Sequence, residues 1–77
     1  MNPNETAQYL ISYFEHERSD SIQAALFYCD AVIEKYNLMK GYTSLLDDKY
    51  FYKDNIAFWN LVKFEISAYE QYNKKWL

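Results

Sequence analysis

The chain is poor in the residues that break or bend regular structure, with one glycine and one proline among 77 residues. So little glycine and proline leaves almost nothing to build tight turns or β-hairpins, which favours helices over a sheet. A phosphate-binding loop of the glycine-rich kind is excluded for the same reason, because such loops need several glycines. The sequence therefore predicts an all-α fold, a small helical bundle formed by a single domain over residues 1–77.

Cysteine and histidine are equally scarce, with one of each. A single cysteine excludes an internal disulfide and suits a reducing compartment. Cys29 falls on an apolar helical stripe, which favours a buried, unreactive thiol over a catalytic one. His16 has Glu15 and Glu17 as immediate neighbours, and adjacent helical residues point to different faces and cannot converge on an ion. We expect no catalytic residue, no metal site and no cofactor, and hence no enzyme.

Long apolar runs and a positive charge excess are also lacking. No uninterrupted apolar stretch approaches the ~20 residues that span a bilayer, and the start "MNPNETAQ" does not have the pattern of a signal peptide. The net charge is −3, whereas nucleic-acid affinity comes mainly from neutralising phosphates. These features predict a soluble, cytoplasmic protein that uses neither membrane nor nucleic acid as a partner. Seven of the eight basic residues are lysine, a bias typical of A+T-rich genes and so of a low-GC bacterium or its phage.

Three segments show helical periodicity. We expect the first helix from Glu5 to Arg18, the second from Ser21 to about Lys40, and the third from just after Asp54 to Lys75. Residues 42–53 are expected to form an ordered loop with a short fourth helical turn near 43–48. The expected caps are Asn4, Asp20 (in a capping box with Gln23), Thr43 and Asp54 at N-termini, and Gly41 at the end of the second helix.

Aromatic side chains are abundant, at 21% of the chain with nine tyrosines. One apolar stripe per helix is enough for a three-helix core. The stripes predicted to form it are Ala7, Leu10, Ile11 and Phe14; Ile22, Ala25, Leu26, Cys29, Val32, Ile33 and Tyr36; and Phe58, Trp59, Val62, Ile66, Tyr69 and Trp76.

The second and third helices carry more apolar side chains than these stripes need. We expect the additional side chains to form a partner-binding surface, because tyrosine and phenylalanine favour interfaces. Glu65 lies inside the widened apolar arc of the third helix and is expected at the rim of that surface. The predicted surface consists of Leu61, Phe64, Glu65, Ala68 and Tyr72 with Phe27, Ala31 and Leu38; a second candidate surface is the acidic loop with Asp47, Asp48, Tyr50 and Tyr52.

These observations favour a non-enzymatic protein-interaction module, a bacterial or phage regulator or inhibitor that occupies the surface of a partner protein and forms a homodimer. The acidic residues favour a basic surface on that partner. One alternative is a helix-turn-helix DNA-binding protein, for which the third helix offers Asn60, Lys63, Gln71 and Lys74. Against it, about a dozen residues are expected between the second and third helices. Another alternative is an antitoxin-like subunit that is stable only within a complex.

Overall fold

The computed structural model describes residues 1–15 and 20–76, with side chains as far as Tyr69. It consists of three helices, α1 (Pro3–Glu15), α2 (Ser21–Tyr42) and α3 (Leu46–Trp76), and the described residues contain no strand. The predicted all-α, three-helix bundle is confirmed.

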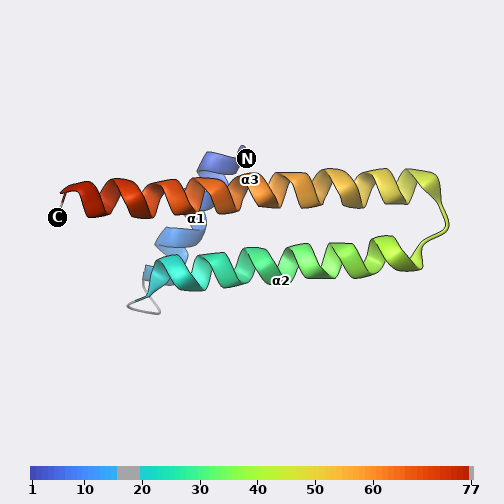
Figure 1. Ribbon diagram of the computed structural model, residues 1–77, viewed down its shortest axis with the longest axis horizontal. Helices are drawn as coiled ribbons and strands as arrows, with labels where there is room; N and C mark the ends of the chain where they lie inside the picture. Colours follow the sequence, from blue (N-terminus) through green and yellow to red (C-terminus); the bar gives the residue numbers. More distant parts are fainter. Residues whose placement is uncertain (16–19, 77) are drawn as a thin grey trace.

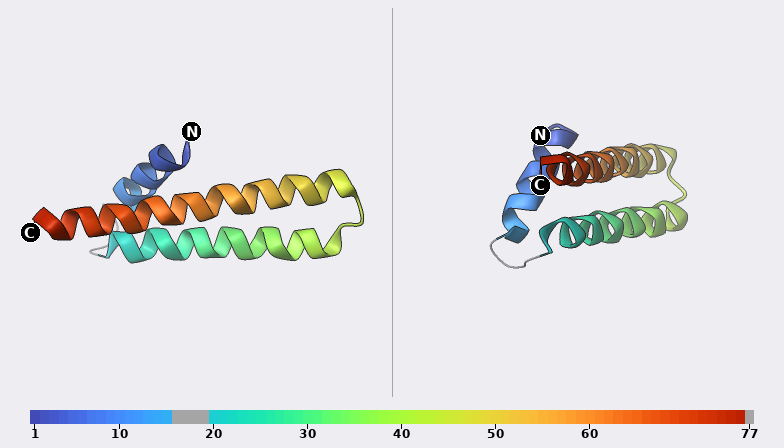
Figure 2. Two further views of the ribbon diagram at one scale, coloured as in Figure 1. Left: turned by 45° about the horizontal axis from the view of Figure 1, so that its top comes forward. Right: turned by 60° about the vertical axis from the view of Figure 1, so that its left-hand side comes forward.

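The helices α2 and α3 run antiparallel and side by side as one long hairpin, and α1 crosses the end of the hairpin that lies away from the α2–α3 connection (Figures 1 and 2). The molecule measures 49 × 20 × 17 Å, with a radius of gyration of 14.2 Å. A compact domain of this length has a radius of gyration of about 11.5 Å. The bundle is therefore elongated, and three helices pack together only at the end that α1 crosses.

The first helix starts earlier than predicted, with Asn2 rather than Asn4 as its cap. The Asn2 side-chain oxygen accepts a hydrogen bond from the backbone N–H of Glu5 at 2.8 Å, and the Asn2 carbonyl accepts one from the Thr6 hydroxyl at 3.0 Å. Pro3 takes the first helical position, where its missing N–H has no helical partner to lose. The expected end at Arg18 lies outside the described residues.

The second helix begins at Ser21 as predicted, but both of its expected caps need correction. Asp20 occupies the N-cap position without a capping hydrogen bond from its side chain. Gly41 lies inside the helix, and its backbone is not in the left-handed region that a glycine cap uses. Instead Thr43 ends the helix in an extended conformation, and its N–H donates to the Met39 carbonyl at 3.2 Å.

The third helix begins at Leu46, so the predicted loop over 42–53 and the separate fourth turn are wrong. The Thr43 hydroxyl accepts a hydrogen bond from the Leu45 N–H at 3.2 Å and donates one to the Asp48 carboxylate at 3.4 Å. Asp47 and Asp48 then lie in the first turn, where the helix dipole favours negative charge. Asp54 lies within the helix, and only residues 43–45 connect α2 to α3.

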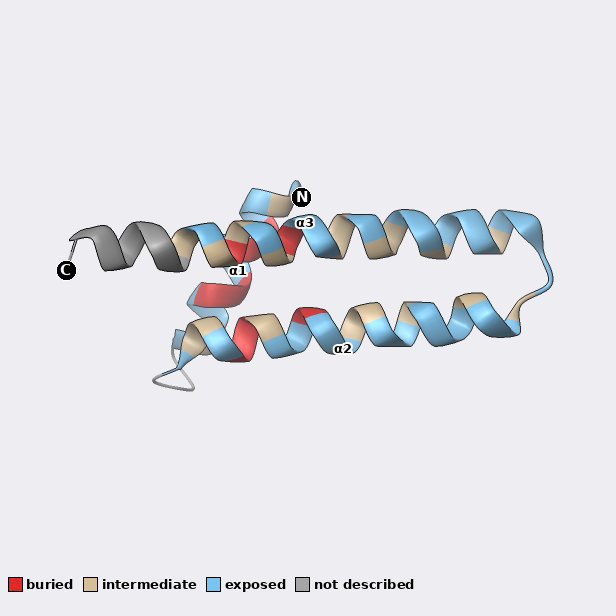
Figure 3. Ribbon diagram, in the orientation of Figure 1, coloured by how far each residue is buried: buried red, intermediate tan, exposed pale blue. Residues whose placement is uncertain are grey.

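The buried core is confined to the end of the hairpin that α1 crosses (Figure 3). Between Asp30 and Leu61 no residue is buried. We call residues 30–61 the distal half of the hairpin. At the end that α1 crosses, small residues on α2 allow the three helices to approach one another closely. The buried hydrophobic residues are Ala7, Leu10, Ile11, Ala24, Ala25, Cys29, Val62 and Ile66.

Candidate protein-interaction surfaces

The third helix carries a row of exposed, mainly apolar side chains between Leu46 and Ala68. Phe64 is 69% exposed and Leu61 55% exposed. Phe64 lies two residues from both Val62 and Ile66, which are fully buried, and two residues turn a helix by about 200°. The row therefore faces away from the core. We call it the outer flank of α3, and it comprises Leu46, Tyr50, Ala57, Leu61, Phe64 and Ala68.

Phe27, Ala31 and Leu38 are exposed on α2, but they do not join the outer flank of α3. Phe27 lies two residues from both Ala25 and Cys29, which are fully buried, so it points away from α3. The two exposed rows consequently lie on opposite sides of the hairpin. The single surface predicted from the sequence is in fact two surfaces, and the side chain of Tyr72 lies outside the described part.

The four residues of the predicted acidic loop lie on the first turns of α3 and do not form one patch. Asp47 and Tyr50 are exposed. Asp48 is half-buried and accepts the Thr43 hydrogen bond, while Tyr52 is half-buried with its ring centroid 6.0 Å from that of Tyr36 on α2. Asp47 and Tyr50 are available to a partner, whereas Asp48 and Tyr52 already have contacts within the chain.

Glu65 is half-buried and makes an intramolecular contact. Its carboxylate accepts a hydrogen bond from the Asn4 side-chain amide at 3.1 Å, and the Asn4 side-chain oxygen accepts one from Gln8 at 2.7 Å. Glu65 thus ties α3 to the start of α1. Sequence reasoning grouped it with the exposed residues because the periodicity does not show which neighbouring helix covers the rim.

A groove between α2 and α3 was not predicted as a site. It has a volume of about 410 Å³. Two of its lining rings, Tyr28 on α2 and Trp59 on α3, are in contact with each other, with centroids 5.8 Å apart. Sequence reasoning assigned Val32, Tyr36 and Trp59 to the core. The one sequence feature that indicated a further apolar surface here is the presence of apolar residues on two faces of α2. We call this the hairpin groove, and it is lined by Tyr28, Val32, Lys35, Tyr36, Met39, Phe51, Tyr52 and Trp59.

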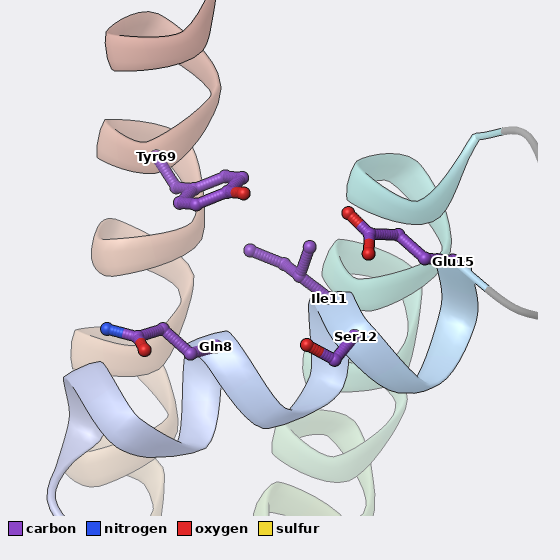
Figure 4. A pocket seen from close by; sticks show the side chains of 5 residues that line it. All are labelled: Gln8, Ile11, Ser12, Glu15 and Tyr69. Atoms are coloured by element: carbon purple, nitrogen blue, oxygen red, sulfur yellow. The ribbon is translucent and has the colours of Figure 1, made fainter.

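A smaller pocket lies between α1 and α3, where the ring of Tyr69 lies across from Ile11 and Glu15 (Figure 4). Gln8 and Ser12 complete its lining, and its volume is about 130 Å³. Small-molecule sites usually enclose about 300–1,000 Å³. Glu15 is the one carboxylate in its lining. Among the described residues, no group of three or more His, Cys, Asp or Glu side chains could hold a metal ion.

Cys29 is fully buried in the core, as predicted. Burial raises the pKa of its thiol from 9.0 to about 11, because the thiolate would lose its hydration, and the negative charge of Asp30 acts in the same direction. Lys63, which forms an ion pair with Asp30, partly offsets this rise. The thiol is therefore protonated at neutral pH and unsuited to nucleophilic attack.

We expect Cys29 to react with an aromatic disulfide reagent at pH 8 at least about a hundredfold more slowly in the folded chain than in the chain unfolded by urea. Because the folded-state pKa is raised, the thiol's contribution to stability is complete below pH 9.0 and is lost as the pH rises through about 11. Urea unfolding of the wild type and of Cys29→Ala, each at pH 9 and at pH 11, separates the contribution of this thiol from that of the other groups that titrate in this range. Equal thiol reactivity in the folded and unfolded chains would contradict the burial.

Only residues 43–45 connect α2 to α3, so the expected separation of about a dozen residues is wrong, and the connection is short enough for a helix-turn-helix unit. In that motif, however, the two helices cross at about 90–120°, whereas α2 and α3 lie side by side along their length (Figure 1). Lys63, one of the proposed base-reading residues, is paired with Asp30. This geometry does not favour the DNA-binding alternative.

The chain matches no protein-family model, no curated protein and no solved structure. Within the described residues, every helix is too short or too polar to cross a bilayer.

Proposed function

We propose that the protein is a non-enzymatic interaction module that binds another protein through the outer flank of α3. The observation that carries this proposal is the exposure of large apolar side chains along one face of that helix, with Phe64 at 69% and Leu61 at 55%. Aromatic and large aliphatic side chains at the centre of an interface supply most of its binding energy. The spacing of the row suits a partner helix that lies along α3.

Charged residues border the outer flank of α3 and indicate how such a partner would be oriented. Asp47 and Asp54 are exposed along one edge, and Lys49 and Lys53 along the other. A partner helix with basic side chains facing the aspartates and acidic side chains facing the lysines would match both edges. Pairs of this kind at the rim of an interface contribute more to orientation and association rate than to affinity. A regulator or inhibitor of this kind acts by occupying the partner's surface.

The experiment compares two exposed phenylalanines on opposite sides of the hairpin. Wild type, Phe64→Asp and Phe27→Asp are immobilised and used to capture proteins from an extract of the native host. The retained protein is then purified, and its binding to each chain is measured by calorimetry. We expect Phe64→Asp to weaken binding at least about tenfold, and Phe27→Asp to leave it unchanged.

Both variants should keep the helical circular dichroism of the wild type, since each replaced side chain is largely exposed. A partner that binds wild type and Phe64→Asp with equal affinity would rule out the outer flank of α3 as the binding surface.

A further inference from the structure

The chain exposes more surface than a folded monomer of its mass. An ordinary monomer of 9.3 kDa exposes about 5,000 Å². This chain exposes 5885 Å², an excess of about 900 Å². Each partner of a standard protein–protein interface buries about 800 Å². The excess is summed over the whole elongated chain, and it is comparable with the area that one partner of an ordinary interface buries.

The hairpin groove adjoins the place where α1 ends. On the face of the hairpin that α1 covers, Phe14 of α1 meets Tyr28 with ring centroids 6.4 Å apart, and Tyr28 meets Trp59 in turn. Tyr28 lines both the hairpin groove and a second hollow beside α1, which is formed with Tyr9, Leu10, Tyr13 and Phe14. The hairpin groove therefore continues the face that α1 covers into the distal half, where no third helix lies on it (Figures 1 and 3).

The chemistry of the hairpin groove suits contact with an identical surface. Lys35 is its one charged side chain, and three tyrosines line it beside apolar residues. Phe51 is 58% exposed, Tyr28 45% and Met39 39%. A groove that is nearly neutral and apolar gains nothing from a partner of opposite charge, and pairing it with itself brings few like charges together. Tyrosine hydroxyls can form hydrogen bonds with one another across such a contact, or accept one from Lys35.

We propose that the hairpin groove is the self-association surface of this protein, occupied by the distal half of a second copy. Two copies related by a twofold axis would present the same groove to each other. Their four helices would form a four-helix section that supplies the missing core of both distal halves. The outer flank of α3 stays free in this dimer, because Phe64 faces away from the buried side of its helix. The inference deepens the proposed interaction function and uses a different surface.

The test measures the mass of the full chain by sedimentation equilibrium from low to high micromolar concentration. The wild type is expected at twice its 9.3 kDa chain mass at the higher concentrations. Phe51→Glu and, independently, Met39→Glu should weaken the dimer at least about tenfold. Phe27→Glu, a matched change of an exposed phenylalanine outside the groove, should leave the dimer intact. Circular dichroism of each variant confirms that its helices are retained.

A wild type that remains at 9.3 kDa at every concentration would overturn the proposal, as would a dimer that is insensitive to both groove variants or is lost in Phe27→Glu. Loss of captured-partner binding in Phe51→Glu without any change of mass would assign the groove to a different protein, which also overturns it. The outcome for Phe64→Asp is read separately, so failure of self-association and failure of partner binding by the outer flank of α3 are distinguishable.

Discussion

Replacing Ile66 by alanine is expected to lower the free energy of unfolding by about 2–5 kcal/mol. Ile66 is fully buried on α3 and belongs to the one cluster that holds all three helices together. Removing its methyl groups loses burial and leaves a cavity between packed neighbours, which cannot collapse freely. A small domain has only about 5–15 kcal/mol of stability, so this single change should remove a large share of it.

The matched control is Ile56→Ala, on the same helix but in the distal half, where Ile56 is half-buried. Urea unfolding followed by circular dichroism at low micromolar concentration gives both values. We expect the loss for Ile56→Ala to be less than half that for Ile66→Ala, since the distal half contains no buried residue. Equal losses would mean that the core extends along the whole hairpin.

Hydrophobic periodicity predicted most of the positions that form the core, though not Ala24, which lies off the predicted stripe of α2 and is buried. It did not predict where along the bundle the core would lie. Ala7, Ala25, Cys29, Val62 and Ile66 were all predicted on core stripes, and all are buried. The stripe on α2 was also expected to continue through Val32, Ile33 and Tyr36, which are half-buried. A stripe shows which face a helix can bury; whether another helix reaches that face depends on the lengths of all three.

The start of α3 is the element boundary that determines the length of the hairpin. Asp47 and Asp48 follow Thr43, a pattern that suits a helix start, but Tyr50, Phe51 and Tyr52 favour strands by propensity. Contacts distant in sequence, such as that between Tyr52 and Tyr36, stabilise the helix instead. With α3 starting at Leu46, the hairpin is much longer than α1, whose 13 residues extend only about 20 Å. The uncovered groove is a consequence of that difference in length.

The orientation of the surplus apolar rows could not be predicted from the sequence either. Helical spacing shows correctly that Phe27 and Phe64 each lie off the core stripe of their own helix. It does not show how two helices are turned relative to each other, which is set by the packing of small residues such as Ala25 and Cys29 where α1 crosses. Two rows that looked like parts of one surface therefore face opposite directions.

Ile11→Asp is expected to detach α1 from the hairpin at pH 7. Ile11 is 3% exposed. A carboxylate placed there would be buried without a positively charged or hydrogen-bonding partner, which costs several kcal/mol. Ser12→Asp is the matched control, because it introduces the same charge at the next residue, which is exposed. We expect Ile11→Asp to unfold or to lose most of its stability and Ser12→Asp to change stability by less than about 0.5 kcal/mol.

Acid should partly reverse the effect of Ile11→Asp. Burial raises the pKa of the introduced carboxyl above its usual value of about 3.9, so the proton binds more tightly in the folded state than in the unfolded state. The destabilisation relative to wild type therefore decreases as the pH falls from 7 toward 4.5, whereas Ser12→Asp shows no such recovery. Urea unfolding at both pH values, followed by tryptophan fluorescence of Trp59 and Trp76, measures this difference. If Ile11→Asp were as stable as Ser12→Asp at pH 7, α1 would not be part of the core, and the three helices would not form one cooperative unit.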